Sequence, residues 1–290
     1  MLRGRFAPTP SGELHMGSLV CALASYLDVK KRGGEWVVRI EDVDLSRCRS
    51  EYESSILRQL ERHGLQWDGP VVRQSERFDL YRECLSELKN RDLVYQCFCS
   101  RSHLRNSGCF ENPQGELIYP GFCRSSKKRG PQQAGVTQFS LRFAMTTGHY
   151  RFEDIVCGWV EGNVSTEVGD FVVRRADGCF AYHLAVVVDD HHQGITRVVR
   201  GSDILPLTGR HLLLMKALGF QQPVFGHIPL VLGQDGQKLS KSASAQAIAQ
   251  QEVRTNLIKA FAHLGIDASK YDGSSVGEML QVGLEAYELT

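Results

Sequence analysis

Residues 3–19 read RGRFAPTPSGELHMGSL, and this stretch decides the fold. Residues 3–7 predict a strand, and a turn rich in proline and glycine follows it. An apolar pattern with helical spacing begins near Gly17 and stops at Gly33-Gly34. Residues 36–40 then predict a second strand. This order of strand, helix and strand is typical of the first crossover of a parallel sheet, so we predict an α/β fold.

The segment His15-Met16-Gly17-Ser18 lies where the first loop enters this helix. A helix beginning there would direct unpaired N–H groups and the positive end of its dipole at an anion. The His15 imidazole could donate to phosphate oxygens, and Gly17 leaves space for a base or ribose. The alternative is that His15 only caps the helix and Gly17 only turns the chain.

A second segment, Lys238-Leu239-Ser240-Lys241-Ser242, places two ammonium groups among small hydroxyl side chains. Alone, such a segment is usually a surface loop. Together with the first segment, it predicts that Lys238 and Lys241 reach the same phosphates and follow the charge that develops when pyrophosphate leaves.

The pattern along the rest of the chain continues the α/β alternation. The near-continuous apolar run of residues 180–188 predicts a strand buried on both faces. Further strands are expected at residues 93–98 and 196–200, with short strands between 138 and 175, and helices at residues 51–63, 78–89, 207–218, 253–263 and 276–286.

The chain has 290 residues, of which 42% are hydrophobic, and a formal net charge of +1. This composition is typical of an ordinary globular protein. No apolar run approaches the roughly 20 residues that cross a bilayer, and no signal peptide is apparent, so we expect a cytoplasmic protein. The small net charge excludes a global basic field for nucleic acid. Nine unevenly spaced cysteines favour thiols or metal ligands over a disulfide framework.

Periodicity fails from Cys97 to about Cys123, which suggests an insertion that needs another reason to fold. Cys97 and Cys99, with Cys123, could bind zinc, whose apparent binding energy in small peptides is roughly 10–16 kcal/mol. The chemistry leaves the fourth ligand open among Tyr119, Cys109 and His103.

The run Asp189-Asp190-His191-His192 also looks like a metal cluster. Consecutive side chains on a strand point to opposite faces, so they cannot all reach one ion. We therefore expect no catalytic metal there, and we expect Mg²⁺ to arrive with ATP and to be held largely by its phosphates.

The two segments, in this order and with α/β patterning between them, resemble the two signatures of class I aminoacyl-tRNA synthetases. Residues 5–12 (RFAPTPSG), 39–44 (RIEDVD) and 199–203 (VRGSD) are similar to motifs of the glutamate-specific branch. The resemblance covers roughly residues 3–242 and implies a Rossmann-type catalytic domain that activates an amino acid with ATP. Ser18 stands where many class I enzymes have a second histidine, so its ATP contact is an expectation only.

The same resemblance implies a glutamate site, and its residue types suit that ligand. Glu41 at a strand end can meet the ammonium, while Arg5 and Arg200 can grip the side-chain carboxylate. Tyr182 would add an apolar wall with a hydroxyl tip. The implied site is completed by the loop residues Phe6, Ala7, Pro8 and Thr9.

Likeness to the family also suggests a zinc ligand set and a particular branch. The pattern C-x-C followed by Y-x-x-x-C is similar to that of short paralogues in the glutamate branch, which implies Cys97, Cys99, Tyr119 and Cys123 around a structural zinc. Residues 243–290 are too few for an anticodon-binding domain, which also favours a short paralogue. Such enzymes activate L-glutamate without tRNA and transfer it to queuosine in the anticodon loop of tRNA(Asp).

From these features we expect four parts and a monomer. Residues 1–96 would form the first half of the catalytic domain, 97–130 the zinc-binding insertion, 131–235 an acceptor-like insertion with the second half, and 236–290 the lysine loop with C-terminal helices. The alternatives are a truncated glutamyl-tRNA synthetase that charges tRNA(Glu), an inactive zinc-containing RNA-binding paralogue, and a nucleotidyltransferase for another carboxylate.

Overall fold

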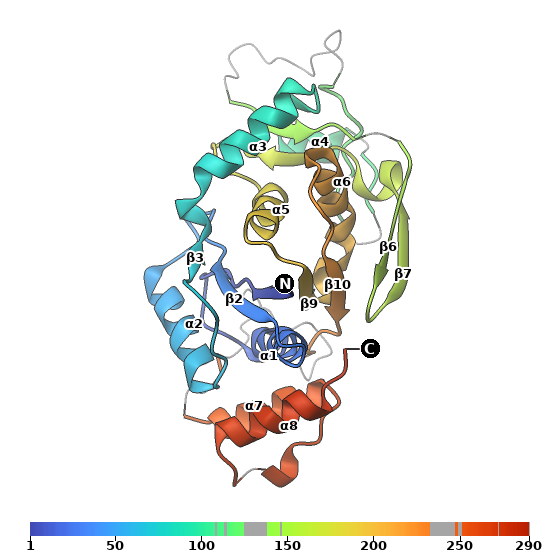
Figure 1. Cartoon of the computed structure of the whole chain (residues 1–290). Coiled ribbons are helices and arrows are strands. Elements are labelled where there is room, and N and C mark those ends of the chain that lie inside the picture. Colours follow the sequence, from blue (N-terminus) through green and yellow to red (C-terminus); the bar gives the residue numbers. More distant parts are fainter. Residues whose placement is uncertain are drawn as a thin grey trace.

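The computed structural model describes residues 1–107, 109–112, 115–124, 138–145, 147–232, 247–248, 251–271 and 273–289. Figure 1 shows an elongated molecule with a central sheet, a small second sheet at one end and two C-terminal helices at the other. None of the helices in these ranges combines the length and the apolar character that a membrane crossing requires.

The central sheet confirms the predicted parallel crossover. Its strands, in spatial order, are β3 (Val72–Arg73), β2 (Glu35–Ile40), β1 (Arg3–Phe6), β9 (Arg197–Gly201), β10 (Val224–Ile228), β6 (His149–Asp154) and β7 (Gly158–Asn163). Every neighbouring pair is parallel except β6 and β7, which form an antiparallel hairpin. The sheet is therefore mostly parallel, as the sequence predicts, and its parallel strands end along one edge.

Helices connect and cover these strands. They are α1 (Met16–Lys30), α2 (Ser50–Arg62), α3 (Phe78–Asn90), α4 (Arg101–Asn106), α5 (Tyr182–His192), α6 (Thr208–Leu218), α7 (Val253–His263) and α8 (Val276–Ala286). In the described ranges, 3₁₀ segments occupy Gln74–Glu76, Ser202–Leu207 and Ser269–Tyr271, and a π-helical turn occupies Val164–Val168. The helices predicted at 51–63, 78–89, 207–218, 253–263 and 276–286 are confirmed, each to within one residue at either end.

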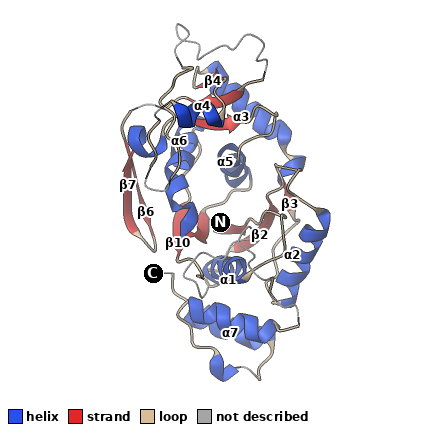
Figure 2. Cartoon of the chain, turned by 180° about the vertical axis from the view of Figure 1, so that it is seen from behind, coloured by secondary structure: helices blue, strands red, loops and turns tan. Residues whose placement is uncertain are grey.

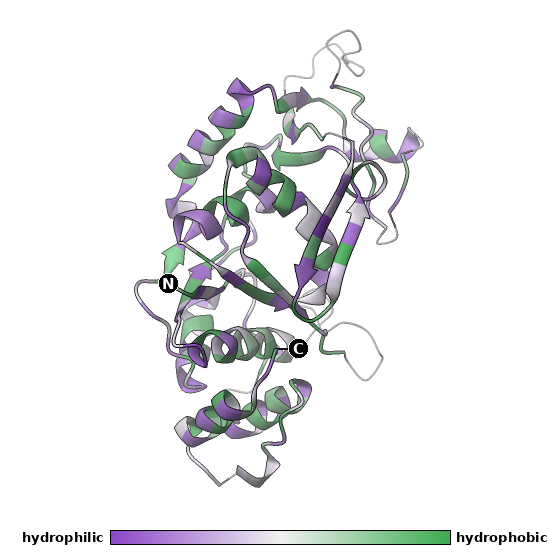
Figure 3. Cartoon of the chain, turned by 45° about the vertical axis from the view of Figure 1, so that its right-hand side comes forward, coloured by the Kyte–Doolittle hydropathy of each residue, from purple (hydrophilic) through white to green (hydrophobic). Residues whose placement is uncertain are grey.

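One hydrophobic core lies between the first crossover and the C-terminal helices. Leu23 and Leu27 of α1 pack there with Phe261 of α7 and Met279 of α8, all fully buried. Figure 3 shows that α7 and α8, below α1, carry both hydrophilic and hydrophobic residues. Only their apolar residues join this core, so the C-terminal pair packs beneath the helix that begins at His15.

The strand predicted at residues 180–188 is wrong. Residues 182–188 belong to α5, which begins at Tyr182 and contacts α3 and α6. The apolar run Leu184–Val188 is buried all round, so it has no polar face from which the helical period could be read. Its β-branched valines favour a strand locally, and packing in the second hydrophobic core decides for the helix.

A three-stranded antiparallel sheet forms the other end of the molecule. It consists of β4 (Val94–Cys97), β5 (Ser140–Phe143) and β8 (Phe171–Arg174), in that order. Figure 2 shows β4 and α4 close together at this end. Cys97 ends β4, so the predicted insertion starts directly from this small sheet.

Candidate active site and metal centre

A cavity of about 510 Å³ opens at the carboxyl ends of β1, β2 and β9, and α5 closes one side of it. Open α/β sheets bind ligands at this edge. The structure brings the predicted glutamate residues together here, because residues 5–9, Glu41, Tyr182 and Arg200 all line the cavity. His15, Gly17 and Ser18 line the same cavity from the start of α1.

His15 is the N-cap of α1, which is the role that the sequence leaves open as the alternative to phosphate binding. Its Nδ1 accepts the N–H of Ser18 over 3.3 Å, so the neutral ring carries its proton on Nε2. Capping and ligand binding are compatible, because His15 also lines the cavity. The imidazole is thus oriented by the helix end that would bind an anion.

The second signature, with Lys238 and Lys241, lies outside the described residues. Its two flanks are described. Val231 lines the cavity, and Ala247 forms an isolated bridge with His15. The N–H of Ile248 also donates to the carbonyl of Leu14 over 2.9 Å. Both flanks of the lysine segment therefore lie beside the residues of the first signature.

Beneath the cavity, buried arginines and aspartates form an ion-pair cluster. Arg39 Nη1 lies 2.8 Å from Asp190 Oδ1, and Arg5 Nε lies 3.1 Å from the same oxygen. Burial alone would raise the pKa of Asp190, but Arg5 and Arg39 hold it below its usual range. Asp190 therefore stays charged and fixes both guanidiniums.

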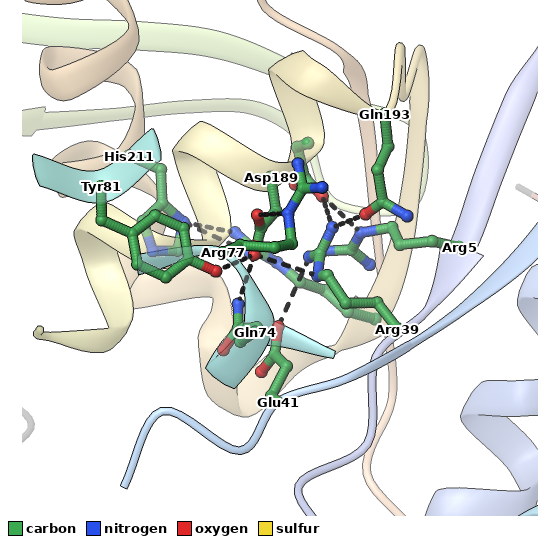
Figure 4. Close-up of polar contacts among 11 residues, drawn as sticks. Arg5, Arg39, Glu41, Gln74, Arg77, Tyr81, Asp189, Gln193 and His211 are labelled. Carbon is green, nitrogen blue, oxygen red and sulfur yellow. Dashed lines mark hydrogen bonds and ion pairs between the residues drawn. The ribbon is translucent and has the colours of Figure 1, made fainter. Parts of the chain in front are cut away.

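Asp189 faces a second set of donors. Its carboxylate accepts from Arg77 Nε at 2.6 Å, the Tyr81 hydroxyl at 2.7 Å and Gln74 Nε2 at 2.8 Å. Figure 4 shows these groups around Asp189 at one side of the arginine cluster. The acidic run suspected as a metal cluster thus binds guanidiniums, and because it lies on a helix, the strand argument used against a metal there was wrong.

Glu41 is a partly buried carboxylate that lines the cavity. Its Oε1 lies 3.4 Å from Arg39 Nη2, and its side chain is 10% exposed. Burial raises the pKa of Glu41, while Arg39 and Arg5 oppose that rise. The Arg39 and Glu41 pair is therefore a buried pair and not the surface pair that such spacing usually gives.

Arg200 contacts neutral groups. Its Nε donates to His227 Nε2 over 2.9 Å, and Nη2 donates to Thr208 Oγ1 over 2.8 Å. His211 Nδ1 lies 3.3 Å from both Nη atoms. Tyr182 is the first residue of α5 and lines the cavity beside Arg200, and burial followed by the nearby Glu41 raises its pKa to about 12.

Sequence reasoning missed several residues that hold the arginines. Asp190, His211, His227 and Asp154 lie on α5, α6, β10 and β6, which the fold brings together across long stretches of sequence. The only local signal was the acidic pair after the apolar run. No spacing rule connects Asp154 with Arg200, because β7, a π-helical turn, β8 and α5 lie between them.

The cysteines of the insertion form a candidate metal centre. The ligand atoms of Cys97, Cys99 and Cys123 lie within 4.8 Å of one another, and the last two sulfurs are 3.6 Å apart. A tetrahedral zinc with bonds of about 2.3 Å separates its sulfurs by roughly 3.8 Å, so the three thiols fit such an ion.

Tyr119 occupies the place of a fourth donor. Its hydroxyl oxygen lies 3.7 Å from Cys99 Sγ and accepts the N–H of Cys123 over 2.8 Å. Cys109 and His103 are outside the three-thiol group. Arg142 Nε lies 3.2 Å from Cys97 Sγ and donates to it. The donor set therefore suits a metal ion, with Tyr119 nearer than either alternative.

Comparison with known proteins gives consistent matches. The family model described as tRNA synthetases class I (E and Q), catalytic domain, matches residues 1–270. The chain is 45% identical over 263 residues to the glutamyl-Q tRNA(Asp) synthetase of Dechloromonas aromatica, covering 91% of this chain and 86% of that protein. It is 44% identical over 288 residues to the enzyme of that name from Idiomarina loihiensis, covering 99% and 97%.

Among solved structures, a glutamate tRNA ligase from Elizabethkingia meningosepticum in complex with its amino acid superimposes with a TM-score of 0.78 at 29% identity. The alignment covers 100% of this chain and 66% of that ligase. This chain therefore spans just under two thirds of that protein, while it matches most of the length of the shorter relatives.

Proposed function

Because this chain belongs to the class I tRNA synthetases for glutamate and glutamine, and within them to the glutamyl-Q tRNA(Asp) synthetases, we propose that it activates L-glutamate with ATP and transfers it to queuosine in tRNA(Asp). Membership in this family makes the chain a ligase with a class I catalytic domain. The observation that carries the proposal is the single cavity that holds Glu41 and Arg200 beside His15.

Glutamate is proposed to bind across the buried charges of the cavity. Glu41 accepts hydrogen bonds from the substrate ammonium, and this positive charge would stabilise a carboxylate that burial disfavours. Arg200 donates to the side-chain carboxylate, and Arg5 adds positive charge although Asp190 already holds its Nε. Tyr182 and residues 6–9 form the walls. Glutamine would leave a buried guanidinium without an anion, which can cost a factor of roughly 10⁴ in selectivity.

Adenylate formation is proposed at the start of α1. The α-carboxylate oxygen of glutamate forms a bond to the α-phosphorus of ATP, and the bond from that phosphorus to the bridging oxygen breaks, releasing pyrophosphate. His15, Gly17 and the N–H groups of the helix end would stabilise the negative charge. Lys238 and Lys241 would follow the leaving pyrophosphate, and the position of Val231 and Ala247 supports that role.

Mg²⁺ is proposed to arrive with ATP, bound mainly by its phosphates. In the insertion, Cys97, Cys99, Tyr119 and Cys123 would hold zinc in a closed, structural site. Bound zinc would supply folding energy to a part of the chain whose own hydrophobic cluster is small.

We also propose a monomer in the cytoplasm, with the oligomeric state to be measured by light scattering.

The test uses labelled glutamate and two preparations of tRNA(Asp), one with queuosine and one from cells that cannot make it. We expect glutamate-dependent exchange of pyrophosphate into ATP without tRNA, and label on the queuosine-containing tRNA only. RNase mapping should place that label in the anticodon loop, and periodate oxidation of the cyclopentene diol beforehand should abolish it. Label on the 3′-terminal adenosine, or charging of tRNA(Glu), would support the truncated glutamyl-tRNA synthetase instead.

A further inference from the structure

Arg200 differs from the other guanidiniums of the cavity in the charge of its partners. Arg5 and Arg39 each form an ion pair with Asp190. Within the described part of the chain, Arg200 forms no ion pair, and its donors go to two histidines and Thr208. The contacts use one of the two Nη1 hydrogens, so this arginine keeps a donor and a charge for the cavity.

The bond pattern fixes the tautomer of His227. Its Nε2 must accept, because it lies 2.9 Å from Arg200 Nε, which can only donate. The ring proton therefore lies on Nδ1, which faces Asp154 Oδ2 at 2.6 Å. Both His227 and Asp154 have side chains with no exposed surface. Asp154, His227 and Arg200 thus form one buried chain of hydrogen bonds.

Asp154 is itself held in a fixed orientation. Its Oδ1 accepts the backbone N–H groups of Val156 and Cys157 at 3.0 Å and that of His227 at 3.1 Å. Burial alone would raise the pKa of Asp154, but the bonds from the His227 side chain and from the Cys157 and His227 N–H groups lower it to about 2. The carboxylate therefore has one oxygen committed to the backbone and the other to the imidazole.

The histidines around Arg200 are neutral. Burial lowers the pKa of His227, which outweighs the opposing effect of Asp154, and burial and then Arg200 lower that of His211. His183, 3.3 Å from His211, has its pKa lowered to about 3 by burial and the nearby arginines. The rings of His227 and His211 therefore accept hydrogen bonds from Arg200 without cancelling its charge.

We propose that Asp154 and His227 are positioning residues, which hold Arg200 through an uncharged acceptor and so present its positive charge to a carboxylate of the substrate. A carboxylate in place of His227 would fix the guanidinium equally well, but it would neutralise the group that must recognise an anion. This role rests on the proposed binding of glutamate and adds residues outside the cavity lining to its specificity.

The substitution Asp154→Asn tests the tautomer directly. The introduced amide keeps its oxygen for the three backbone N–H groups, so its NH₂ must face His227 Nδ1. The imidazole proton then moves to Nε2 and opposes the Nε–H of Arg200. We expect the KM for glutamate in tRNA-independent pyrophosphate exchange to rise about 10–100-fold, the effect of losing a buried bond to a charged group. The KM for ATP should change less than about threefold.

A second variant keeps the proposal falsifiable if Asp154→Asn affects folding. In His227→Gln, the new side chain can place its carbonyl oxygen near the former Nε2, and this acceptor does not depend on the charge at position 154. Asp154→Asn should therefore raise the glutamate KM much less when added to His227→Gln than when added to the wild type. Additive effects of the two substitutions would overturn the proposed coupling.

A matched control is Asp170→Asn. Asp170 is a buried carboxylate that accepts from the Met145 N–H and the Tyr95 hydroxyl, and it does not line the cavity. The Asp170→Asn variant should have a lower melting temperature than the wild type and an unchanged KM for glutamate. If Asp154→Asn behaves like this control, the positioning role is wrong. If the wild-type protein shows no glutamate-dependent exchange, the proposed function fails first, so the two failures are distinguishable.

Discussion

Arg39 and Asp190 form a buried ion pair, with Nη1 2.8 Å from Oδ1 and almost no exposed surface on either side chain. The pair joins β2 to the last turn of α5. Burial lowers the pKa of Arg39, but Asp190, Glu41 and Asp189 raise it well above its usual value, so the guanidinium stays charged. Figure 4 shows Arg39 near both Arg5 and Glu41, two residues that line the cavity.

Removing the charge of Asp190 should therefore destabilise the whole protein. In Asp190→Asn, Arg5 and Arg39 would share a buried site without their common anion, so we expect a loss of about 3–5 kcal/mol in the free energy of unfolding. Urea denaturation followed by circular dichroism measures it. Asp177→Asn, in an exposed pair with Arg175, should cost little. Equal losses in both variants would contradict a special role for the buried pair.

Replacing Arg200 by lysine should weaken glutamate recognition selectively. A lysine ammonium cannot reproduce the planar fork that contacts His227, Thr208 and the cavity together. We expect Arg200→Lys to raise the glutamate KM about 100-fold in pyrophosphate exchange, with a nearly unchanged KM for ATP. Arg151→Lys, on the exposed face of β6, is the control. A parallel rise in both KM values would show that Arg200 does not select the amino acid.

Metal content should distinguish the candidate fourth ligands. We expect one zinc per chain in the wild type and loss of zinc in Cys99→Ser, because this thiol lies beside both Cys123 and Tyr119. Tyr119→Phe should bind zinc more weakly against a chelator, whereas Cys109→Ser and His103→Asn should bind it as the wild type does. Inductively coupled plasma mass spectrometry measures the metal. Loss of zinc in Cys109→Ser with retention in Tyr119→Phe would reverse the assignment.

Acid should destabilise the fold through its buried histidines. His183 has a folded pKa of about 3, below the value of about 6.5 for an exposed histidine, so the unfolded chain binds the proton first. Its stabilising contribution is complete above pH 6.5 and is lost as the pH falls toward 3, at up to about 1.4 kcal/mol per pH unit. Urea midpoints between pH 7 and pH 4 measure this slope.

The variant His183→Gln should flatten that slope, because its side chain does not titrate. His149→Gln, at an exposed position on β6, should leave the slope as it is in the wild type. An unchanged slope in His183→Gln would mean that His183 does not contribute to the loss of stability in acid.

Local pattern was sufficient for the first crossover. The Pro- and Gly-rich turn before Gly17 and the periodic apolar residues after it agree with β1 and α1, since turn chemistry and helical period act over few residues. The same reasoning failed at Val186, where a fully buried helix and a buried strand present the same uniform apolar run. Packing against α3 and α6 decides that segment, and sequence spacing does not record it.

Site residues that belong to a sequence motif were predicted. Residues that only hold those motif residues in place were missed. Arg5 and Arg200 lie near the carboxyl ends of β1 and β9, Glu41 directly follows β2, and all three line the cavity as expected. The partners of Arg200 come from α6 and β10, and only the folded chain brings Asp154 of β6 to His227. The zinc proposal rested on spacing for Cys97 and Cys99, while Tyr119 depended on resemblance and now lies closer than Cys109 or His103.

The order of strands in the sheet has a consequence for biosynthesis. β1 pairs with β2 on one side and with β9 on the other, where Arg197 is the register partner of Gly4. The ribosome synthesises β9 much later than β1 and β2. A ribosome adding roughly 5–20 residues per second needs about 10–40 s to make the intervening chain. During that interval β1 has an open strand edge, so we expect chaperones to bind the nascent chain until translation passes β9.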